Sequence, residues 1–365
     1  MAGSIFGKHF TIQTFGESHG EGIGVVVDGC PAGLPLCADD IQIYLNRRKP
    51  GQTKFATPRK EADEVEILSG VFEGKTTGTP IALLVRNTSQ RSGDYSEIAS
   101  YYRPGHADYT FDEKYGFRDY RGGGRSSGRE TIGRVAAGAI ALKLLKELGI
   151  EICAYTKSIG PVSIDYNRFD AEAILTTPTC MPDSVASGEA EHYLEECMKS
   201  LDSSGGVIEC IAKGVPVGVG EPVFDKLDAN LGKAIMSIGS VKAFEIGDGI
   251  SVASMKGSEN NDAFAMADGK ITKLTNHSGG ILGGMSDGSD LVLRAYIKPT
   301  PSIFKEQNTV NKSGENISVQ IKGRHDPVIV PRAVVVVEAM TALTIVDLMM
   351  ENATSKLQNL KKIYE

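Results

Sequence analysis

A weak internal repeat of strand-like segments constrains the fold of this chain most. Three segments of the first half have counterparts in the second half, and the order of the three is kept. The pairs are IGVVVDGCPAGLP (23–35) with IECIAKGVPVGVG (208–220), VEILSGV (65–71) with FEIGDGI (244–250), and TPIALLVRN (79–87) with SDLVLRAYI (289–297). The third pair agrees only in its pattern, and Gly-rich strands can resemble one another by chance. A repeat that keeps its order nevertheless predicts two similar β-rich halves.

Hydrophobic patterning places strands and helices within these halves. Strands are predicted at 23–28, 81–86, 207–213 and 290–297, and helices at 39–48, 184–201, 225–237 and, as a buried helix, within 332–359. A further helix is expected to start at an S-x-x-E capping box of Ser127 and Glu130 and to end near Gly149. We therefore predict an α+β fold in a single domain, residues 1–365. Its two intertwined, pseudo-repeated β-α-β halves would form antiparallel sheets sandwiched with helices.

The composition argues against several classes of protein. The formal charge of the 365 residues is −7, whereas nucleic-acid binding needs a strongly basic face, so we expect no nucleic-acid partner. The six cysteines form no CxxC pair, and we expect neither a metal site nor a disulfide framework. No signal-peptide core and no uninterrupted apolar run of about 18 residues is present, which predicts a cytoplasmic protein without a membrane partner.

The stretch DYRGGGRSSGRET (119–131) combines several features of an anion site. A run of three glycines, Gly122 to Gly124, lets the backbone approach a ligand closely. A helix that begins after Ser127 would present unpaired N–H groups to a bound anion. Arg125 and Arg129 add forked donors that suit phosphate or carboxylate. The stretch therefore predicts an oxyanion-binding site rather than a solvated surface turn.

Three of the six histidines lie in Gly-flanked loops, which favours acid–base chemistry. They are His19 in FGESHG, His106 in RPGHADYT and His325 in KGRHDP. Two further stretches carry donors for anions. NRRKPGQTKFATPRK (46–60) is basic, and YIKPTPSI (296–303) places Lys298 before two hydroxyl side chains. Together these loops predict a polyanionic substrate, a phosphorylated cofactor, or both.

Nine motifs of the chain resemble those of the chorismate synthase family, from about residue 4 to residue 350. In chain order they are FGESHG, RRKPGQ, SGVFEG, RPGHADYT, DYRGGGRSSGRET, GEPVFDKLDA, NHSGGILGG, KPTPSI and GRHDP. The resemblance implies a lyase of the shikimate pathway, which makes chorismate and phosphate from 5-enolpyruvylshikimate 3-phosphate by an anti-1,4-elimination. It also implies reduced FMN as a cofactor without net redox change, with NADPH as a candidate reductant, and a homotetramer.

The resemblance further implies roles for individual residues. His19 would protonate the departing phosphate, His106 would protonate or stabilise the reduced flavin, and Asp326 would help relay the proton of substrate C6 by way of flavin N5. Ser18 and Ser127 would join the hydrogen-bond network of these groups. FMN contacts would come from Arg125, Ser126, Ser127, Gly239, Ser240, Gly283, Lys298, Pro299, Thr300, Pro301, Ser302 and Arg324. Substrate or NADPH contacts would come from Arg48, Lys54 and Arg129.

The sequence departs from the common family pattern at three positions. Gly128 stands where alanine is usual, and Lys49 and Lys54 stand where arginine is common, which keeps the charge but removes bidentate geometry. No insertion is large enough for a flavin reductase, so an external reductant is expected. Two other functions stay open, a phosphate-ligand or RNA-binding protein and an NADPH-linked flavin oxidoreductase. With 7% aromatic residues and no tryptophan, stacking platforms for RNA are not evident.

Overall fold

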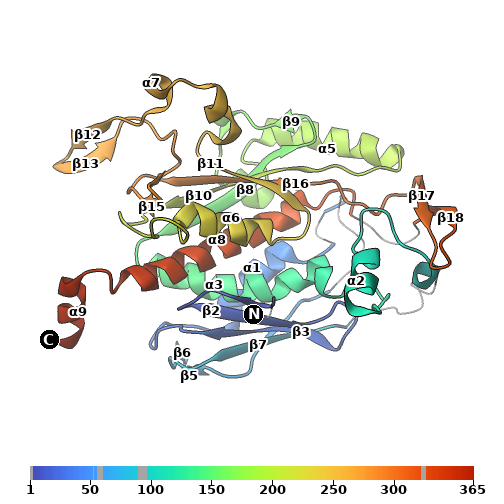
Figure 1. The fold of residues 1–365 in the computed structure, drawn as a ribbon, viewed down its shortest axis with the longest axis horizontal. Coiled ribbons are helices and arrows are strands. Elements are labelled where there is room, and N and C mark those ends of the chain that lie inside the picture. The colour runs from blue at the N-terminus through green and yellow to red at the C-terminus, as the bar shows by residue number, and fades with distance from the viewer. Residues whose placement is uncertain (1–2, 52, 56–60, 89–96, 322–325) are drawn as a thin grey trace.

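Two five-stranded antiparallel sheets enclose a layer of helices in the computed structural model, which describes residues 3–51, 53–55, 61–88, 97–321 and 326–365 (Figure 1). The first sheet has the order β1-β2-β3-β7-β4. Its strands are β1 (Ile5–Phe6), β2 (Thr11–Gly16), β3 (Gly22–Asp28), β4 (Val65–Ile67) and β7 (Ile81–Arg86). The second sheet has the order β11-β16-β10-β8-β9. Its strands are β8 (Glu151–Ile159), β9 (Val162–Ser163), β10 (Gly206–Lys213), β11 (Val241–Ile246) and β16 (Leu291–Ile297).

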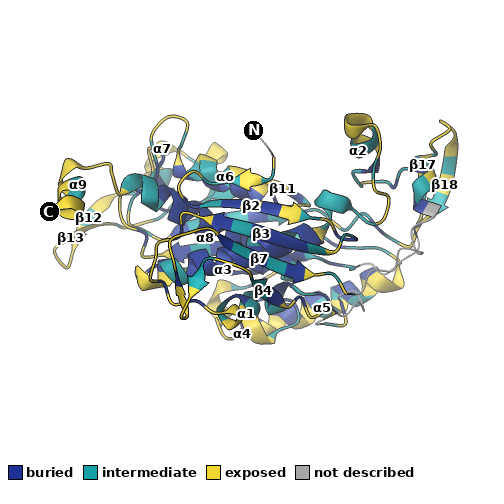
Figure 2. Ribbon diagram, turned by 90° about the horizontal axis from the view of Figure 1, so that it is seen from below, coloured by how far each residue is buried: buried dark blue, intermediate teal, exposed yellow. Residues whose placement is uncertain are grey.

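Four helices fill the space between the sheets. They are α1 (Ala38–Arg48), α3 (Thr131–Glu147), α6 (Leu227–Met236) and α8 (Val330–Asn352). The helices α1 and α3 pack on the first sheet, α6 and α8 pack on the second, and α3 lies along α8 (Figure 1). Figure 2 shows that the buried residues concentrate in these sheets and helices. The predicted α+β class, with antiparallel sheets and helices sandwiched together, is confirmed.

The remaining elements lie around this core. The helices are α2 (Asp108–Tyr115), α4 (Ala173–Thr176), α5 (Ser184–Lys199), α7 (Gly257–Asn260) and α9 (Leu357–Tyr364). The described chain also has four two-stranded hairpins: β5 (Val71–Phe72) with β6 (Lys75–Thr76), β12 (Phe264–Ala267) with β13 (Lys270–Lys273), β14 (Ile281–Leu282) with β15 (Met285–Ser286), and β17 (Glu306–Val310) with β18 (Asn316–Gln320).

The internal repeat is visible in the order of the strands. The row β2-β3-β7-β4 of the first sheet corresponds to the row β8-β10-β16-β11 of the second, so the pair recognised only by pattern, β7 and β16, is equivalent in space. The equivalence extends to side chains, because Thr76 Oγ1 donates to the carbonyl of Pro31 at 2.6 Å and Ser286 Oγ donates to the carbonyl of Pro216 at 2.5 Å. Each sheet takes its strands from one half only, and the halves meet in the helical layer.

The start of α3 differs from the predicted capping box. A 3₁₀ turn, Gly128–Glu130, precedes the α-helix, and Ser127 Oγ accepts a bond from the N–H of Arg129 at 3.3 Å. The carboxylate of Glu130 does not return to the cap. It accepts instead from Thr14 Oγ1 at 3.0 Å and from Arg134 Nε at 2.8 Å. The prediction of a capping box was wrong, because the buried carboxylate of Glu130 accepts hydrogen bonds from side chains that the fold brings near it.

The long apolar helix near the C-terminus lies in the core. Within the described chain, α8 is long and apolar enough to cross a membrane, with a mean hydropathy of 2.0, but 83% of that stretch is buried inside the fold. It packs against α3 on one side and against the second sheet on the other. This burial is that of a core helix, as the nearly uniform hydrophobicity predicted.

Candidate active site

A cleft of about 1110 Å³ opens at the end of the helical layer next to α2. Loops that follow β2, β7, α6 and β16 form its wall together with the C-terminal end of α1 and the first turns of α3 and α8. The helices α3 and α8 thus both direct their N-terminal ends to this cleft. Helix N-termini carry partial positive charge and free N–H groups, which favour an anion.

Basic side chains outnumber acidic ones in the described wall. The nine basic residues are Arg48, Arg103, Arg118, Arg125, Arg129, Arg134, Lys242, Lys298 and Arg332. The five acidic residues are Glu17, Asp108, Asp119, Glu130 and Asp326. Although the net charge of the chain is −7, this wall has more basic than acidic side chains. Such a cleft suits a ligand with several negative charges.

His19 lies against the glycine run that the sequence singled out. His19 as a whole residue is 6% exposed, and its ring Nδ1 lies 3.2 Å from Ser18 Oγ. Gly122 has a φ of +85°, and a Cβ there would lie 2.7 Å from the His19 ring and 2.9 Å from Ser18 Oγ. The sequence predicted that the glycine run lets the backbone approach a ligand closely. In the structure, the absence of a side chain at Gly122 lets the backbone approach His19.

The three arginines of the stretch 119–131 have separate partners. Arg121 forms an exposed ion pair with Asp119 at 2.7 Å and does not line the cleft. Hydrogen bonds from Arg121 lower the pKa of Asp119, and the nearby His19 acts in the same direction. Arg125 lines the cleft, but its guanidinium donates to Thr14 Oγ1 at 2.6 Å and so ties this loop to β2.

His106 joins two loops that lie far apart in the sequence. Its Nε2 lies 2.7 Å from Ser302 Oγ, and Lys298 Nζ donates to the carbonyl of Gly105 at 3.0 Å. The two contacts hold the loop before α2 against the loop after β16. Thr300 and Pro301 line the same wall, whereas Pro299, which precedes them, does not.

Asp326 lies at the other side of the cleft, beside the start of α8. Its Oδ2 accepts from Arg332 Nη1 at 2.6 Å. Arg332 Nε donates in turn to the backbone carbonyl of Arg48 at 3.1 Å. The guanidinium of Arg332 thus fixes the predicted relay carboxylate relative to the C-terminal end of α1.

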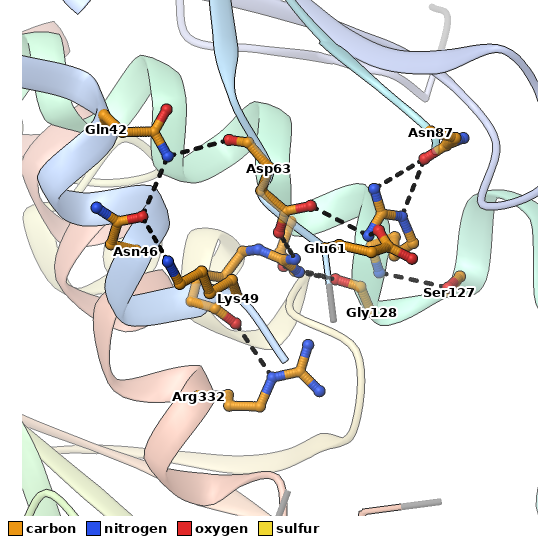
Figure 3. A network of polar contacts seen from close by, with 12 residues as sticks. Gln42, Asn46, Lys49, Glu61, Asp63, Asn87, Ser127, Gly128 and Arg332 are labelled. Atoms are coloured by element: carbon orange, nitrogen blue, oxygen red, sulfur yellow. Dashed lines mark hydrogen bonds and ion pairs between the residues drawn. The ribbon is translucent and has the colours of Figure 1, made fainter. Parts of the chain in front are cut away.

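Arg48 and Arg129 meet in a buried polar network around Asp63, which Figure 3 labels. Asp63 lies between them and accepts from Arg48 Nη2 at 2.6 Å and from Arg129 Nη1 at 3.2 Å. Arg129 is also paired with Glu61 and donates from Nη2 to Asn87 Oδ1 at 2.8 Å. Burial lowers the pKa of Arg48, and the charge of Asp63 opposes that shift. Both arginines line the cleft, so the network forms part of its wall.

Asp108 and Arg103 form a second buried pair in the wall. Arg103 donates from Nε and Nη2 to the two carboxylate oxygens at 2.8 and 2.7 Å. Burial alone would raise the pKa of Asp108, but this bidentate contact outweighs it and the pKa lies below its usual value. The pair connects the first turn of α2 to the loop that carries His106.

Several predicted residues are not brought to the cleft. Lys54 is exposed and pairs with Glu195 of α5 at 2.8 Å and with Glu191 at 3.3 Å. Gly283 lies in the turn between β14 and β15 and does not line the cleft. Arg324 and His325 fall outside the described residues. The other predicted residues line the wall, namely Ser18, His19, Arg48, His106, Arg125, Ser126, Ser127, Arg129, Gly239, Ser240, Lys298, Thr300, Pro301, Ser302 and Asp326.

Sequence reasoning missed part of the wall. The residues without a predicted role include Arg103, Asp108, Arg118, Arg134 and Arg332, together with the aromatic side chains of Phe111 and Tyr115. Arg103 stands beside His106 in the quoted RPGHADYT motif, which was an available signal. No sequence signal marked Asp63, because the partners of its carboxylate come close only in the folded chain.

Buried polar atoms in the wall provide a test of whether a charged ligand fits. Arg48 Nε, Arg118 Nε and Thr300 Oγ1 have no hydrogen-bond partner among the described residues. All three residues line the cleft, and Thr300 belongs to the loop predicted to contact FMN. Because an unsatisfied buried donor costs free energy, such a wall suits ligands rich in acceptor oxygens. The residues present therefore suit a ligand that carries phosphate or carboxylate groups.

The fold and this cleft define an enzyme that acts on a negatively charged substrate. A family model described as chorismate synthase matches residues 10–350. Over the full length of both chains, this chain is 71% identical to a chorismate synthase of Lachnoclostridium phytofermentans and 67% identical to one of Agathobacter rectalis. A crystal structure of chorismate synthase superposes with a TM-score of 0.77 at 31% identity, covering 98% of this chain and 97% of the other.

The chain belongs to the chorismate synthase family. It is accordingly an enzyme, a lyase of the shikimate pathway. The resemblance that the nine motifs predicted is confirmed at full length.

Proposed function

We propose that the cleft binds 5-enolpyruvylshikimate 3-phosphate together with reduced FMN and eliminates phosphate to give chorismate, in anti-1,4 geometry and without net redox change. The observation that carries this proposal is the convergence of His19, His106 and Asp326 on one cleft with nine basic side chains in its described wall. The substrate carries a phosphate and two carboxylates. A wall rich in guanidinium groups and helix N-termini can bind all three anionic groups.

Arg48 and Arg129 are proposed to bind the anionic groups of the substrate. Both are largely buried and have fixed partners, so their donors are already oriented before the substrate arrives. Donors that are oriented in advance bind an anionic group with a smaller loss of conformational freedom than mobile ones do. The two arginines would hold the anionic groups of the substrate equally in the ground state and in the transition state.

His19 is proposed as the general acid that protonates the departing phosphate. Its contact with Ser18 orients the ring, and its near-complete burial excludes bulk water. General acid assistance of this kind contributes about 10²–10⁴-fold to the rate. Ser127, which accepts a bond at the start of α3, would belong to the same hydrogen-bond network.

Reduced FMN, when bound, would supply the transient electron donation that lets the elimination avoid a concerted path. Residues that would hold it are Arg125, Ser126, Ser127, Gly239, Ser240, Lys298, Thr300, Pro301 and Ser302. His106, oriented by Ser302, would hold a proton beside the cofactor. Asp326, oriented by Arg332, would take up the proton lost from substrate C6.

Further properties follow from the family and belong to the same proposal. We propose that the chain acts as one domain in a cytoplasmic homotetramer and obtains reduced flavin from an external reductant. A direct contact with NADPH is supported by Arg48 alone, because Lys54 pairs with α5 outside the cleft. Light scattering of the purified protein would test the tetramer.

Anaerobic incubation with reduced FMN and 5-enolpyruvylshikimate 3-phosphate tests the proposal. Phosphate release and chorismate absorbance should rise together, and both should depend on the reduced cofactor. Absence of turnover under these conditions would refute the proposal. Steady NADPH consumption with FMN and without the organic substrate would instead indicate a flavin oxidoreductase.

A further inference from the structure

We propose that Asp63 is a positioning residue that holds the guanidinium groups of Arg48 and Arg129 for substrate binding. Asp63 does not line the cleft, whereas both arginines do. It therefore acts through them rather than on the substrate. This inference rests on the proposed function, because it takes the two arginines as the donors to the anionic groups of the substrate.

The carboxylate of Asp63 bridges the two arginines. Its Oδ2 accepts from Arg48 Nη2 at 2.6 Å and its Oδ1 from Arg129 Nη1 at 3.2 Å. The side chain of Asp63 is 0% exposed and that of Arg48 only 2% exposed, so little water screens the charges. Two guanidinium groups this close would repel each other in such an environment. The bridging carboxylate permits them to share one part of the wall.

The remaining donors of each arginine have further partners. Arg48 Nη1 donates to the carbonyl of Gly128 at 3.2 Å, at the start of the turn that precedes α3. Arg129 Nε and Nη2 both donate to Asn87 Oδ1, at 3.1 and 2.8 Å. Each guanidinium is therefore fixed from at least two directions. Asp63 is the partner that the two have in common (Figure 3).

Charge balance indicates what the network supplies. Arg48 and Arg129 are matched by Asp63 and by Glu61, which pairs with Arg129. The four side chains together carry no net charge. The network therefore provides oriented donors, while net attraction for an anion comes from other groups in the wall, such as Lys242, and from the helix N-termini.

The backbone at Asp63 is held in an unfavourable conformation. Its φ is +48°, in the left-handed region that non-glycine residues rarely adopt. Gln42 of α1 binds the backbone at Asp63 and just after it: its Nε2 donates to the carbonyl of Asp63 at 3.2 Å (Figure 3), and its Oε1 accepts from the N–H of Val65 at 3.1 Å. Strained residues of this kind persist where surrounding contacts maintain them and concentrate at functional sites.

Steady-state kinetics of Asp63→Asn with 5-enolpyruvylshikimate 3-phosphate and reduced FMN test this role. We expect KM to rise about tenfold or more, since loss of the shared charge removes the anionic partner that holds the two buried guanidinium groups relative to each other. The maximal rate should fall much less, because the arginines bind substrate and transition state alike. Asp63→Glu keeps the charge and should recover part of the affinity.

Glu338→Gln is the matched control for loss of a buried ion pair. Glu338 of α8 accepts two bonds from Arg47, the neighbour of Arg48 on α1, at 3.0 and 2.8 Å, and does not line the cleft. The variant should lower the melting temperature and leave KM within about twofold of the wild type. Gln42→Ala provides a second route, because it releases the backbone of Asp63 without altering any charge, and should also raise KM.

The outcomes separate the inference from the proposed function. Wild-type turnover with dependence on reduced FMN supports the function whatever the variants do, and its absence refutes the function alone. If Asp63→Asn and Gln42→Ala both keep the wild-type KM, the positioning role is overturned. It is overturned equally if Glu338→Gln raises KM as much as Asp63→Asn does, because the effect would then follow general destabilisation.

Discussion

Replacing Gly122 by alanine tests the close packing of the glycine run against His19. The added Cβ would lie 2.7 Å from the His19 ring, whereas ordinary contacts begin near 3.4 Å. The ring or the loop must therefore move by about 0.7 Å, the difference between the two values. The added Cβ would also lie 2.9 Å from Ser18 Oγ, so the loop cannot relieve the clash by moving toward Ser18.

Two effects of different size follow from this geometry. Alanine at a φ of +85° costs about 1–2 kcal/mol, which lowers the melting temperature of a domain of this length by about 1–3 °C. Catalysis is more sensitive, because a displacement of about 1 Å at a catalytic group can reduce the rate about 10²-fold. We therefore expect Gly122→Ala to lower turnover about tenfold or more while the protein remains folded.

Anaerobic phosphate release and the thermal transition of each variant measure the two effects separately. Gly116→Ala is the control, since Gly116 has a φ of +80° and open space around its Cβ position. Gly116→Ala has the same unfavourable backbone conformation, but its new Cβ would contact no histidine. This variant should therefore lose stability and keep the wild-type turnover. The reasoning is refuted if Gly122→Ala retains wild-type turnover, or if both variants lose turnover equally.

Three further predictions concern catalysis, the repeat and pH. His19→Ala and His106→Ala should each lower phosphate release at least about tenfold without changing the circular dichroism spectrum, and wild-type rates would contradict their acid–base roles. Thr76→Val and Ser286→Ala should each cost about 1–3 kcal/mol in urea unfolding, and additively, because they remove equivalent hydroxyls in separate halves. Asp183, whose pKa is held well below its usual value mainly by Arg168, stabilises the protein above about pH 4 and loses this effect as the pH falls further. The melting temperature of Asp183→Asn should therefore lie below that of the wild type at pH 6, and the gap should begin to narrow as the pH falls below about 4.

The repeat was predictable from the sequence because strand patterns and turn residues act locally. Gly, Pro and β-branched residues restrict the backbone wherever they occur, so IGVVVDGCPAGLP and IECIAKGVPVGVG form equivalent strands β3 and β10. The sequence could not show that the four central helices form one layer between the sheets. That arrangement depends on which apolar faces can be buried together.

The site was only partly predictable for the same reason. The motifs containing His19, His106 and Asp326 marked their chemistry, and the fold brings all three to one cleft. Lys54 lies in an equally suggestive motif, but its ammonium group forms ion pairs with Glu191 and Glu195 of α5. Glu130 likewise does not form the predicted capping box, because it accepts hydrogen bonds from Thr14 of β2 and from Arg134 of α3.

By itself, the sequence determined the family, the α+β class and the residue types that the chemistry needs, since these follow from local patterns and motifs. Only the tertiary structure decided which charges meet. Asp63 lies between two arginines because α1, the segment before β4 and the start of α3 converge there. Coulomb interactions and burial act over a few ångströms in space, whatever the separation of the residues along the chain. No local pattern around Asp63 could therefore have predicted its partners.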